Sequence, residues 1–289
     1  MSGKASLIVN GAGAVAALIV VGWLGMSWLD KEEPEICEGR YPISTRFDLA
    51  SASGETVTLS ELQARLGLSE WGLLENAKIL APDSDQDRPQ LAVMLREGTG
   101  AGYKAGQPRG GVGFSWLPMS MREAAPKAAC LSYRVYFPEK FDFGDGGTLP
   151  GLSIGTSFDP RGEPDIGQGA AVRPGWNKNG GAVVNIQYAT AEGWKNPPAV
   201  GSEIRWPVGG WVTIEQEVIL NEPGSKNGVV RLWLDGKFAG ENKKLGLRSD
   251  AGLAMAGARA DVHFGSVMSP SVAPADAQIR LTPFVLRWQ

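Results

Sequence analysis

Apolar and polar side chains alternate along several short stretches of the chain. The clearest are residues 131–137, 211–220, 229–234 and 277–288, where apolar positions tend to recur at every second residue. Because successive side chains of a strand point to opposite faces, this period predicts β-strands with one buried face. Pro283 lies within the last stretch and predicts an edge strand or a bulge there. The pattern as a whole favours an antiparallel sandwich or jelly roll.

One short segment after the N-terminus has a helical pattern instead. Thr58 and Glu61 have the spacing of a capping box ahead of Leu59–Leu66, and Gly67 follows as a stop signal. The segment therefore predicts a helix near the beginning of the folded domain.

The N-terminus departs from both patterns, because residues 5–29 contain no charged side chain. A membrane-spanning helix needs roughly 20 apolar residues, so this run is long enough to cross a bilayer. It continues into an acidic stretch with no obvious small-residue cleavage site. We therefore predict a retained transmembrane anchor at residues 1–30, a linker at 31–57 and one β-rich domain at 58–289. Residues 5–29 are also where an integral-membrane protein partner would bind.

Composition agrees with a turn-rich β domain and argues against several functions. The 289 residues include 39 glycines and 19 prolines, which suit many turns between short strands. A formal net charge of −3 provides no basic footprint for nucleic acid. His263 is the only histidine, which excludes multi-histidine metal sites. We expect no metal and no cofactor, and we interpret His263 as structural.

The chain has two cysteines, Cys37 and Cys130, and both follow the apolar run. Paired, they would tie the linker to the domain, as an oxidising compartment allows; two buried free thiols are the alternative. Lys4 precedes the run, whereas Lys31 and Arg40 follow it among acidic residues. This weak asymmetry favours a cytoplasmic N-terminus. We expect a single-pass protein whose C-terminal domain is periplasmic or extracellular.

Residues 133–152, YRVYFPEKFDFGDGGTLPGL, combine a predicted strand with a glycine-rich turn. This stretch resembles the signature of the alginate-lyase-like polysaccharide lyases, the family 14 type, and of their glucuronan-lyase relatives. Residues 211–237, WVTIEQEVILNEPGSKNGVVRLWLDGK, carry a second part of the resemblance. It covers the chain from roughly Leu91 to the C-terminus. The resemblance implies a concanavalin-like β-jelly roll, in which two antiparallel sheets pack together.

The resemblance also locates the reaction centre. The family's lysine, taken to be catalytic, falls at Thr148. The family's arginine element keeps Arg173 and Trp176, whereas its serine is replaced by Ala171. Thr148 is a poor substitute for lysine, because a hydroxyl is a weak base near neutral pH.

The downstream tyrosine pair of the family falls at Asn185 and Gln187, and Tyr188 is displaced from it by one residue. On a strand, that shift would turn Tyr188 to the opposite face. Uronate lyases remove a proton next to a carboxylate, which requires a neutralising cation, a base and an acid. Loss of this chemistry is therefore the favoured interpretation.

The favoured hypothesis is a membrane-anchored, extracytoplasmic domain without catalysis that binds an acidic polysaccharide or a protein partner. Its binding groove would contain five residues from the resemblance and the predicted strands: Arg173, Trp176, Arg134, Asn185 and Gln187.

Two other hypotheses remain open. The protein could be a structural or accessory subunit of an integral-membrane complex, with the anchor helix as the contact. It could also be an active polyuronate lyase with a rearranged site, for which Tyr188, Tyr136 and His263 are weak candidates.

Overall fold

Strands form most of the regular secondary structure in the folded part of the chain. In the computed structural model the described residues are 33–67, 70–84, 86–102, 106, 108–155, 169–190, 193–195, 200–201, 203–266 and 269–289, with only the backbone described at 188–190 and 193–195. Its helices are α2 (Cys37–Arg40), α3 (Leu59–Leu66), α4 (Leu73–Asn76) and α5 (Met119–Ala124). Its strands are β1 (Ile43–Phe47), β2 (Glu70–Trp71), β3 (Ala77–Leu80), β4 (Gln90–Leu95), β5 (Gly113–Trp116), β6 (Ala128–Phe137), β7 (Gly146–Thr148), β8 (Gly151–Gly155), β9 (Gly169–Asn177), β10 (Ala182–Thr190), β11 (Gly193–Lys195), β12 (Gly210–Ile219), β13 (Gly228–Leu234), β14 (Lys237–Leu245), β15 (Met255–Arg259), β16 (His263–Phe264), β17 (Ala277–Leu281) and β18 (Phe284–Trp288).

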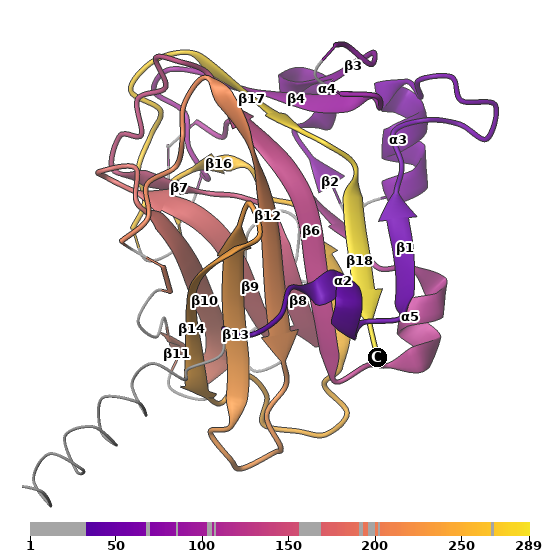
Figure 1. Cartoon of the computed structure of the whole chain (residues 1–289). Helices are drawn as coiled ribbons and strands as arrows, with labels where there is room; N and C mark the ends of the chain where they lie inside the picture. The colour runs from indigo at the N-terminus through magenta and orange to yellow at the C-terminus, as the bar shows by residue number, and fades with distance from the viewer. Residues whose placement is uncertain are drawn as a thin grey trace, which may run out of the picture. The chain divides into compact units, whose positions relative to one another are not determined.

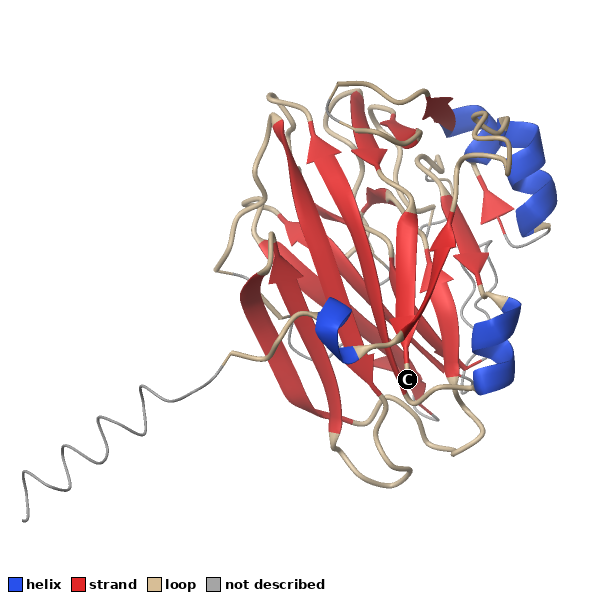
Figure 2. Ribbon diagram, turned by 45° about the vertical axis from the view of Figure 1, so that its right-hand side comes forward, coloured by secondary structure: helices blue, strands red, loops and turns tan. Residues whose placement is uncertain are grey.

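Within the described residues these strands form two sheets of nine strands each. The front sheet, which faces the viewer in Figure 1, has the order β14-β13-β12-β6-β17-β4-β3, with β18 beside β6 and β1 beside β18. The back sheet has the order β11-β10-β9-β8-β15-β5-β2, and β7 lies between β9 and β16. Neighbouring strands are antiparallel, as in the pairs β6–β12 and β9–β10. The predicted all-β fold of two packed antiparallel sheets is therefore confirmed. Helices α3, α4 and α5 lie at its side, whereas α2 lies in front of the sheet (Figure 2).

The core lies between the two sheets and follows the alternation of the sequence. On β6 the odd-numbered residues 131–137 are buried in the core, whereas the even-numbered residues 132–136 are half-buried on the outer face. Two polar contacts also cross the core. Gln216 Nε2 donates a hydrogen bond to the Val172 carbonyl at 2.9 Å, and Tyr133 Oη donates to the Pro150 carbonyl at 2.8 Å. The second contact fixes the signature turn of the back sheet against β6 of the front sheet.

The local signals of the sequence produced the expected elements. Helix α3 spans the predicted residues, and the Glu61 amide donates to Thr58 Oγ1 at 3.2 Å while the Thr58 amide donates to Glu61 Oε2 at 2.6 Å. This reciprocal pair is the predicted capping box. The 277–288 stretch is interrupted at Pro283, between β17 and β18. The strand after Pro283, β18, is not an edge strand, because it pairs with both β6 and β1.

The folded unit starts earlier than predicted. It extends from Ile36 to Gln289, so residues 36–57 belong to it and are not a linker. Phe47, Leu49 and Val57 are buried, and β1 pairs with β18 along its whole length. The short polar stretches between these apolar residues carried no strand period, which is why the sequence suggested a linker.

Residues 36–41, here called the strap, lie on the outer face of the front sheet (Figure 1). Cys37 is joined to Cys130 on β6 by a disulfide, with a Cα–Cα distance of 6.2 Å. The Cys37 amide donates to Glu215 Oε2 at 3.1 Å. The strap is thus held to the sheet by a disulfide and by a hydrogen bond from its backbone.

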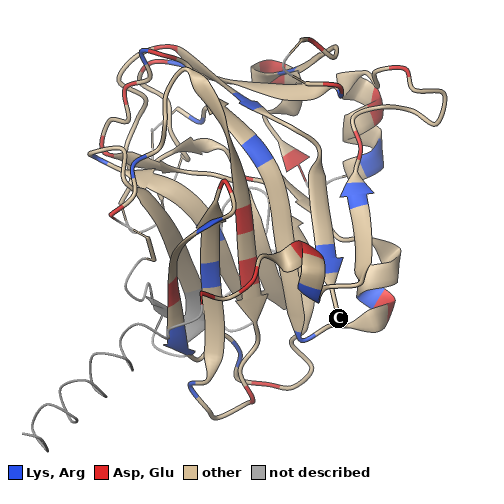
Figure 3. Ribbon diagram, viewed as in Figure 1, with Lys and Arg blue, Asp and Glu red and all other residues tan. Residues whose placement is uncertain are grey.

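Beneath the strap a buried carboxylate is surrounded by cations. Glu217 on β12 is fully buried, with Arg40 Nη1 at 2.7 Å and Arg231 Nη1 at 2.6 Å. The Tyr41 hydroxyl donates to the same carboxylate. Figure 3 shows the acidic positions on β12 beside the strap and a basic position farther along β6. The strap therefore covers the acidic end of this outer face.

Among the residues described, none of the helices combines the length and the apolar character needed to cross a bilayer. The predicted anchor at residues 5–29 lies outside the described residues.

Candidate functional site

The register of the back sheet brings the predicted site positions together. Thr148 on β7 pairs with Gly175 on β9 on one side and with His263 on β16 on the other. Arg173, two residues before Gly175, pairs with Asn185 on β10. Since paired residues and alternate residues of a strand share a face, these side chains lie on the outer face of the back sheet.

Trp176 does not belong to this face. It lies three residues after Arg173 and is 2% exposed in the core, where its Nε1 donates to the Phe143 carbonyl at 2.9 Å. The signature glycines make room for it, because a Cβ atom on Gly147 would collide with the Trp176 ring. Its predicted role in glycan binding is therefore wrong, since the ring packs between the sheets.

Arg173 is the centre of a buried cluster of charges. Its Nη1 lies 2.5 Å from Asp261 Oδ2, and its Nη2 donates to Gln187 Oε1 at 2.5 Å. Arg259 Nε lies 2.9 Å from both oxygens of Asp261. The side chains of Arg173 and Asp261 are 4% and 1% exposed. Asp261 is therefore a counterion that the two arginines share, and both of its oxygens are engaged.

The protonation of this cluster follows from burial and from the arginines. Burial alone would raise the pKa of Asp261, but Arg259 and Arg173 outweigh it and hold the pKa at about 2. Burial lowers the pKa of His263 to about 4, although Asp261 acts in the opposite direction. Near neutral pH, Asp261 is therefore ionised and His263 is neutral.

Thr148, at the family's lysine position, is fully buried. Its Oγ1 donates to the Gly265 carbonyl at 3.0 Å, so the hydroxyl is committed to the backbone. The Trp71 ring lies beside His263, with centroids 6.1 Å apart, and Arg109 lies over Trp71 at 4.8 Å. These side chains help to cover the face on which a substrate would have to lie.

Two other predicted residues lie on the opposite side of the sandwich. Arg134 and Tyr136 are on β6, where they share the outer face of the front sheet with Trp211. The predicted groove containing both Arg134 and Arg173 therefore does not exist, because the two residues belong to different sheets. The same separation removes Tyr136 from the reaction centre.

The tyrosine-pair positions divide as the strand period requires. Asn185 pairs with Arg173 and is half-buried, whereas Gln187 is buried against Arg173. The backbone of Tyr188 pairs with Ala170, a core residue. Position 188 thus alternates with Gln187, as the one-residue shift predicts.

Asp261 and Arg259 were missed from the sequence. They alternate with His263 in a strand-like run, Arg-x-Asp-x-His, so the period-two pattern places all three on one face. That pattern was the available signal, but it did not reveal that Arg173, 88 residues away, would be the partner of Asp261.

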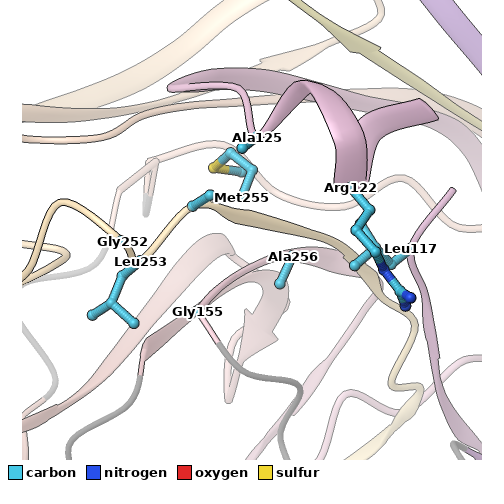
Figure 4. Close-up of a pocket in the computed structure, with 9 residues that line it drawn as sticks. Leu117, Arg122, Ala125, Gly155, Gly252, Leu253, Met255 and Ala256 are labelled. Carbon is cyan, nitrogen blue, oxygen red and sulfur yellow. The ribbon is translucent and has the colours of Figure 1, made fainter. Parts of the chain in front are cut away.

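A separate cavity of about 230 Å³ lies near α5 and the beginning of β15. Figure 4 shows Arg122 descending from α5 beside Leu117, with Leu253, Met255 and Ala256 on the strand side. The lining is apolar apart from Arg122, and none of the predicted site residues contributes to it. It gives no indication of a saccharide site.

The chemistry available at the outer face of the back sheet is limited by this arrangement. Arg173 is buried and already pairs with Asp261, which Arg259 shares. The Thr148 hydroxyl is bonded to the backbone, and His263 is buried. The described residues therefore form a buried ion cluster in the place where the family resemblance puts a reaction centre.

Comparison with known proteins agrees with the resemblance. The sequence profile of the family Polysaccharide lyase 14 matches residues 83–281. Among solved structures, the PL-14 alginate lyase from Aplysia kurodai has a TM-score of 0.66 at 20% identity, over 86% of this chain and 99% of that chain.

Two other solved structures share the fold. The alginate lyase vAL-1 from Chlorella virus has a TM-score of 0.59 at 18% identity, over 74% of this chain and 90% of that chain. The endo-β-1,4-glucuronan lyase from Trichoderma reesei has a TM-score of 0.53 at 9% identity, over 86% and 96%. No curated protein sequence matches the chain.

Proposed function

Since the chain belongs to polysaccharide lyase family 14, we propose that it is a family member that binds an acidic polysaccharide without cleaving it. We further propose that it does so outside the cytoplasm, held to the membrane by its N-terminal segment.

The observation that carries the loss of catalysis is the pairing of Arg173 with Asp261. Elimination from a uronate requires a cation that meets the substrate carboxylate as charge develops in the transition state. Arg173 is 4% exposed and forms an ion pair with Asp261 at 2.5 Å. Thr148 stands in place of the lysine and is bonded to the Gly265 carbonyl. Together these contacts support the loss of both the available cation and the base that the reaction requires.

The ligand class is supported by the relatives. The solved structures of similar fold include proteins named as lyases of alginate and of glucuronan, both polyuronates. A lyase fold that keeps its two sheets while losing its reaction centre retains the outer surfaces on which a long polyanion can bind.

The location is supported by two features of the sequence. Residues 5–29 are long and apolar enough for an anchor, and the two cysteines form a disulfide. Disulfides persist in the periplasm and outside the cell, whereas thiols in the cytoplasm stay reduced. Intact-mass measurement of membrane-extracted protein tests the anchor; a mature start near residues 32–37 would contradict it.

The test of the activity uses the full chain in mild detergent, incubated with alginate, polymannuronate, polyguluronate and glucuronan. Elimination forms a double bond that absorbs ultraviolet light, so slow turnover accumulates to a detectable signal. We expect no unsaturated product, with the Aplysia kurodai enzyme as positive control, but retarded migration of the protein in gels that contain a polyuronate. Product formation that Tyr188→Phe abolishes would establish a rearranged lyase site. Absence of binding to every polyuronate would contradict the proposed ligand.

A further inference from the structure

Aromatic and basic side chains gather on the outer face of the front sheet, beyond the end covered by the strap. Trp211 on β12 pairs with Tyr136 on β6, and Tyr136 pairs with Arg280 on β17. Arg134 lies two residues along β6 from Tyr136 and therefore on the same face. These four residues, here called the Arg134 face, cross three neighbouring strands and about 10 Å of the sheet.

The rings and guanidinium groups of this face contact each other. The Arg280 guanidinium lies 4.2 Å from the Tyr136 ring centroid and 5.2 Å from that of Trp211. Arg134 lies 5.6 Å from the Trp211 centroid. Cation–π contacts of this kind orient both partners. The four side chains therefore form one ordered, half-buried surface.

The charges on this face are not all compensated. Arg280 Nη1 lies 3.3 Å from Asp83 Oδ2 and 3.3 Å from Gln90 Oε1. Arg134, in contrast, forms no ion pair with any residue that the structure describes. Lys78 follows on the same row, since Arg280 pairs with Ala92 and Ala92 with Lys78, and it is exposed. The face thus presents positive charge to solvent.

One buried donor on this face also lacks a partner. Trp211 Nε1 is inaccessible to solvent and has no hydrogen-bond partner among the described residues. A buried polar group without a partner is destabilising, so such groups are uncommon in folded proteins. A ligand with oxygen acceptors, reaching this indole after a small rotation, would satisfy it.

These properties match the chemistry of a uronate chain. A sugar ring offers an apolar face of C–H groups, which packs on an aromatic ring, and hydroxyl oxygens that accept from an indole N–H. Its carboxylate suits the planar fork of an arginine that no internal carboxylate occupies. We propose that the Arg134 face binds a uronate segment of the acidic polysaccharide, on the side of the sandwich opposite the family's reaction centre. This inference rests on the proposed function and names the surface that performs it.

The experiment is a calorimetric titration of the full chain in detergent with size-defined oligomannuronate and oligoglucuronate. Arg134→Ala is expected to weaken binding at least tenfold, because a charge-assisted contact is lost. Arg134→Lys keeps the charge but not the planar fork of the guanidinium, so its affinity should lie between those of the unmodified protein and Arg134→Ala. Arg65→Ala, which removes an exposed arginine from α3, is the matched control and should leave the affinity unchanged.

The outcomes separate this inference from the proposed function. Asn185→Ala alters the outer face of the back sheet and should not change the affinity. If Asn185→Ala weakens binding and Arg134→Ala does not, the polysaccharide binds to the back sheet. The assignment of the binding site to the Arg134 face is then wrong, while the proposed function stands. If the unmodified protein binds no polyuronate, the proposed function fails. Equal binding of a single-stranded DNA oligonucleotide that competes with oligomannuronate would overturn uronate recognition in favour of a general polyanion surface.

Discussion

Arg173 and Arg134 lie on the outer faces of opposite sheets, and they differ in their burial and in their charge partners. Arg173 is almost fully buried and shares Asp261 with Arg259. Arg134 is half-buried, lies over the Trp211 ring and forms no ion pair with a described residue. A buried cation needs a permanent partner, whereas a cation at the surface is solvated and can exchange water for a ligand.

The comparison shows why a conserved-looking motif residue can be a poor guide to function. Arg173 occupies the position that the family resemblance assigns to the reaction centre, yet it is buried and paired with Asp261. Arg134 occupies no position of the reaction centre, yet it retains the capacity to bind an anion. The availability of a charge, rather than its place in a motif, decides what it can do.

The largest expected effect comes from removing the partner of the buried arginines. Asp261→Asn keeps the size of the side chain but removes the carboxylate that Arg173 and Arg259 share. Breaking a buried ion pair from one side costs about 3–5 kcal/mol of unfolding free energy. Urea denaturation measures it. Arg134→Ala, as the control on the other sheet, removes only a half-buried cation–π contact and should lower the unfolding free energy by no more than about 1 kcal/mol. Similar losses for both variants would remove the contrast between the two faces.

The disulfide tests the covered end of the front sheet. The bond between Cys37 and Cys130 closes a loop with a sequence separation of 93 residues. The chain-entropy relation gives about 4–5 kcal/mol for such a loop, and measured values are commonly about 2–4 kcal/mol. Replacing both cysteines by alanine should therefore cost about 3 kcal/mol in denaturant unfolding, and reductant should destabilise the unmodified protein alone. Recovery of both cysteines as free thiols in non-reducing peptide maps would contradict this prediction and weaken the proposed location.

Local signals predicted the fold better than they predicted the site. The alternation on β6 and the capping box of α3 depend on residues close in sequence, and both were right. Trp176 was assigned to the groove although it lies three residues from Arg173, and positions three apart on a strand face opposite ways. In that case the strand period was a better guide than the motif.

The partners of the buried charges could not be predicted in the same way. Arg173 meets Asp261 because the register of β9, β7 and β16 places them side by side. Nothing near either residue in the sequence encodes that register. The prediction for Arg134 was wrong for the same reason, since assigning it to a groove with Arg173 required knowing which sheet each strand joins.

The pH dependence of stability probes the buried cluster without changing its contacts. Burial lowers the pKa of His263 from 6.5 to about 4, so the folded protein prefers the neutral ring. This contribution is fully present above pH 6.5 and is lost as the pH falls toward 4, by up to about 3 kcal/mol. Asp261, with its pKa lowered from 3.8 to about 2, adds a further loss below pH 4. Unfolding free energies measured from pH 7 to pH 4 should fall for the unmodified protein and fall less for His263→Asn. Parallel curves would show that His263 titrates normally.

The smallest expected effect is on catalysis, where restoring the family's lysine should change nothing. A lysine at position 148 would be buried between Gly175 and His263, and burial would lower its pKa and make it a possible base. Elimination also needs the substrate carboxylate to be neutralised, and Arg173 remains paired with Asp261. Because catalytic groups act as a unit, the single replacement Thr148→Lys should give no unsaturated product from alginate or glucuronan. Thr148→Ser, which keeps a hydroxyl, is the matched control, and circular dichroism establishes that both variants are folded. Appearance of product in Thr148→Lys but not in Thr148→Ser would mean that the pairing with Asp261 does not block the reaction centre, and the contrast between Arg173 and Arg134 would then lose its functional meaning.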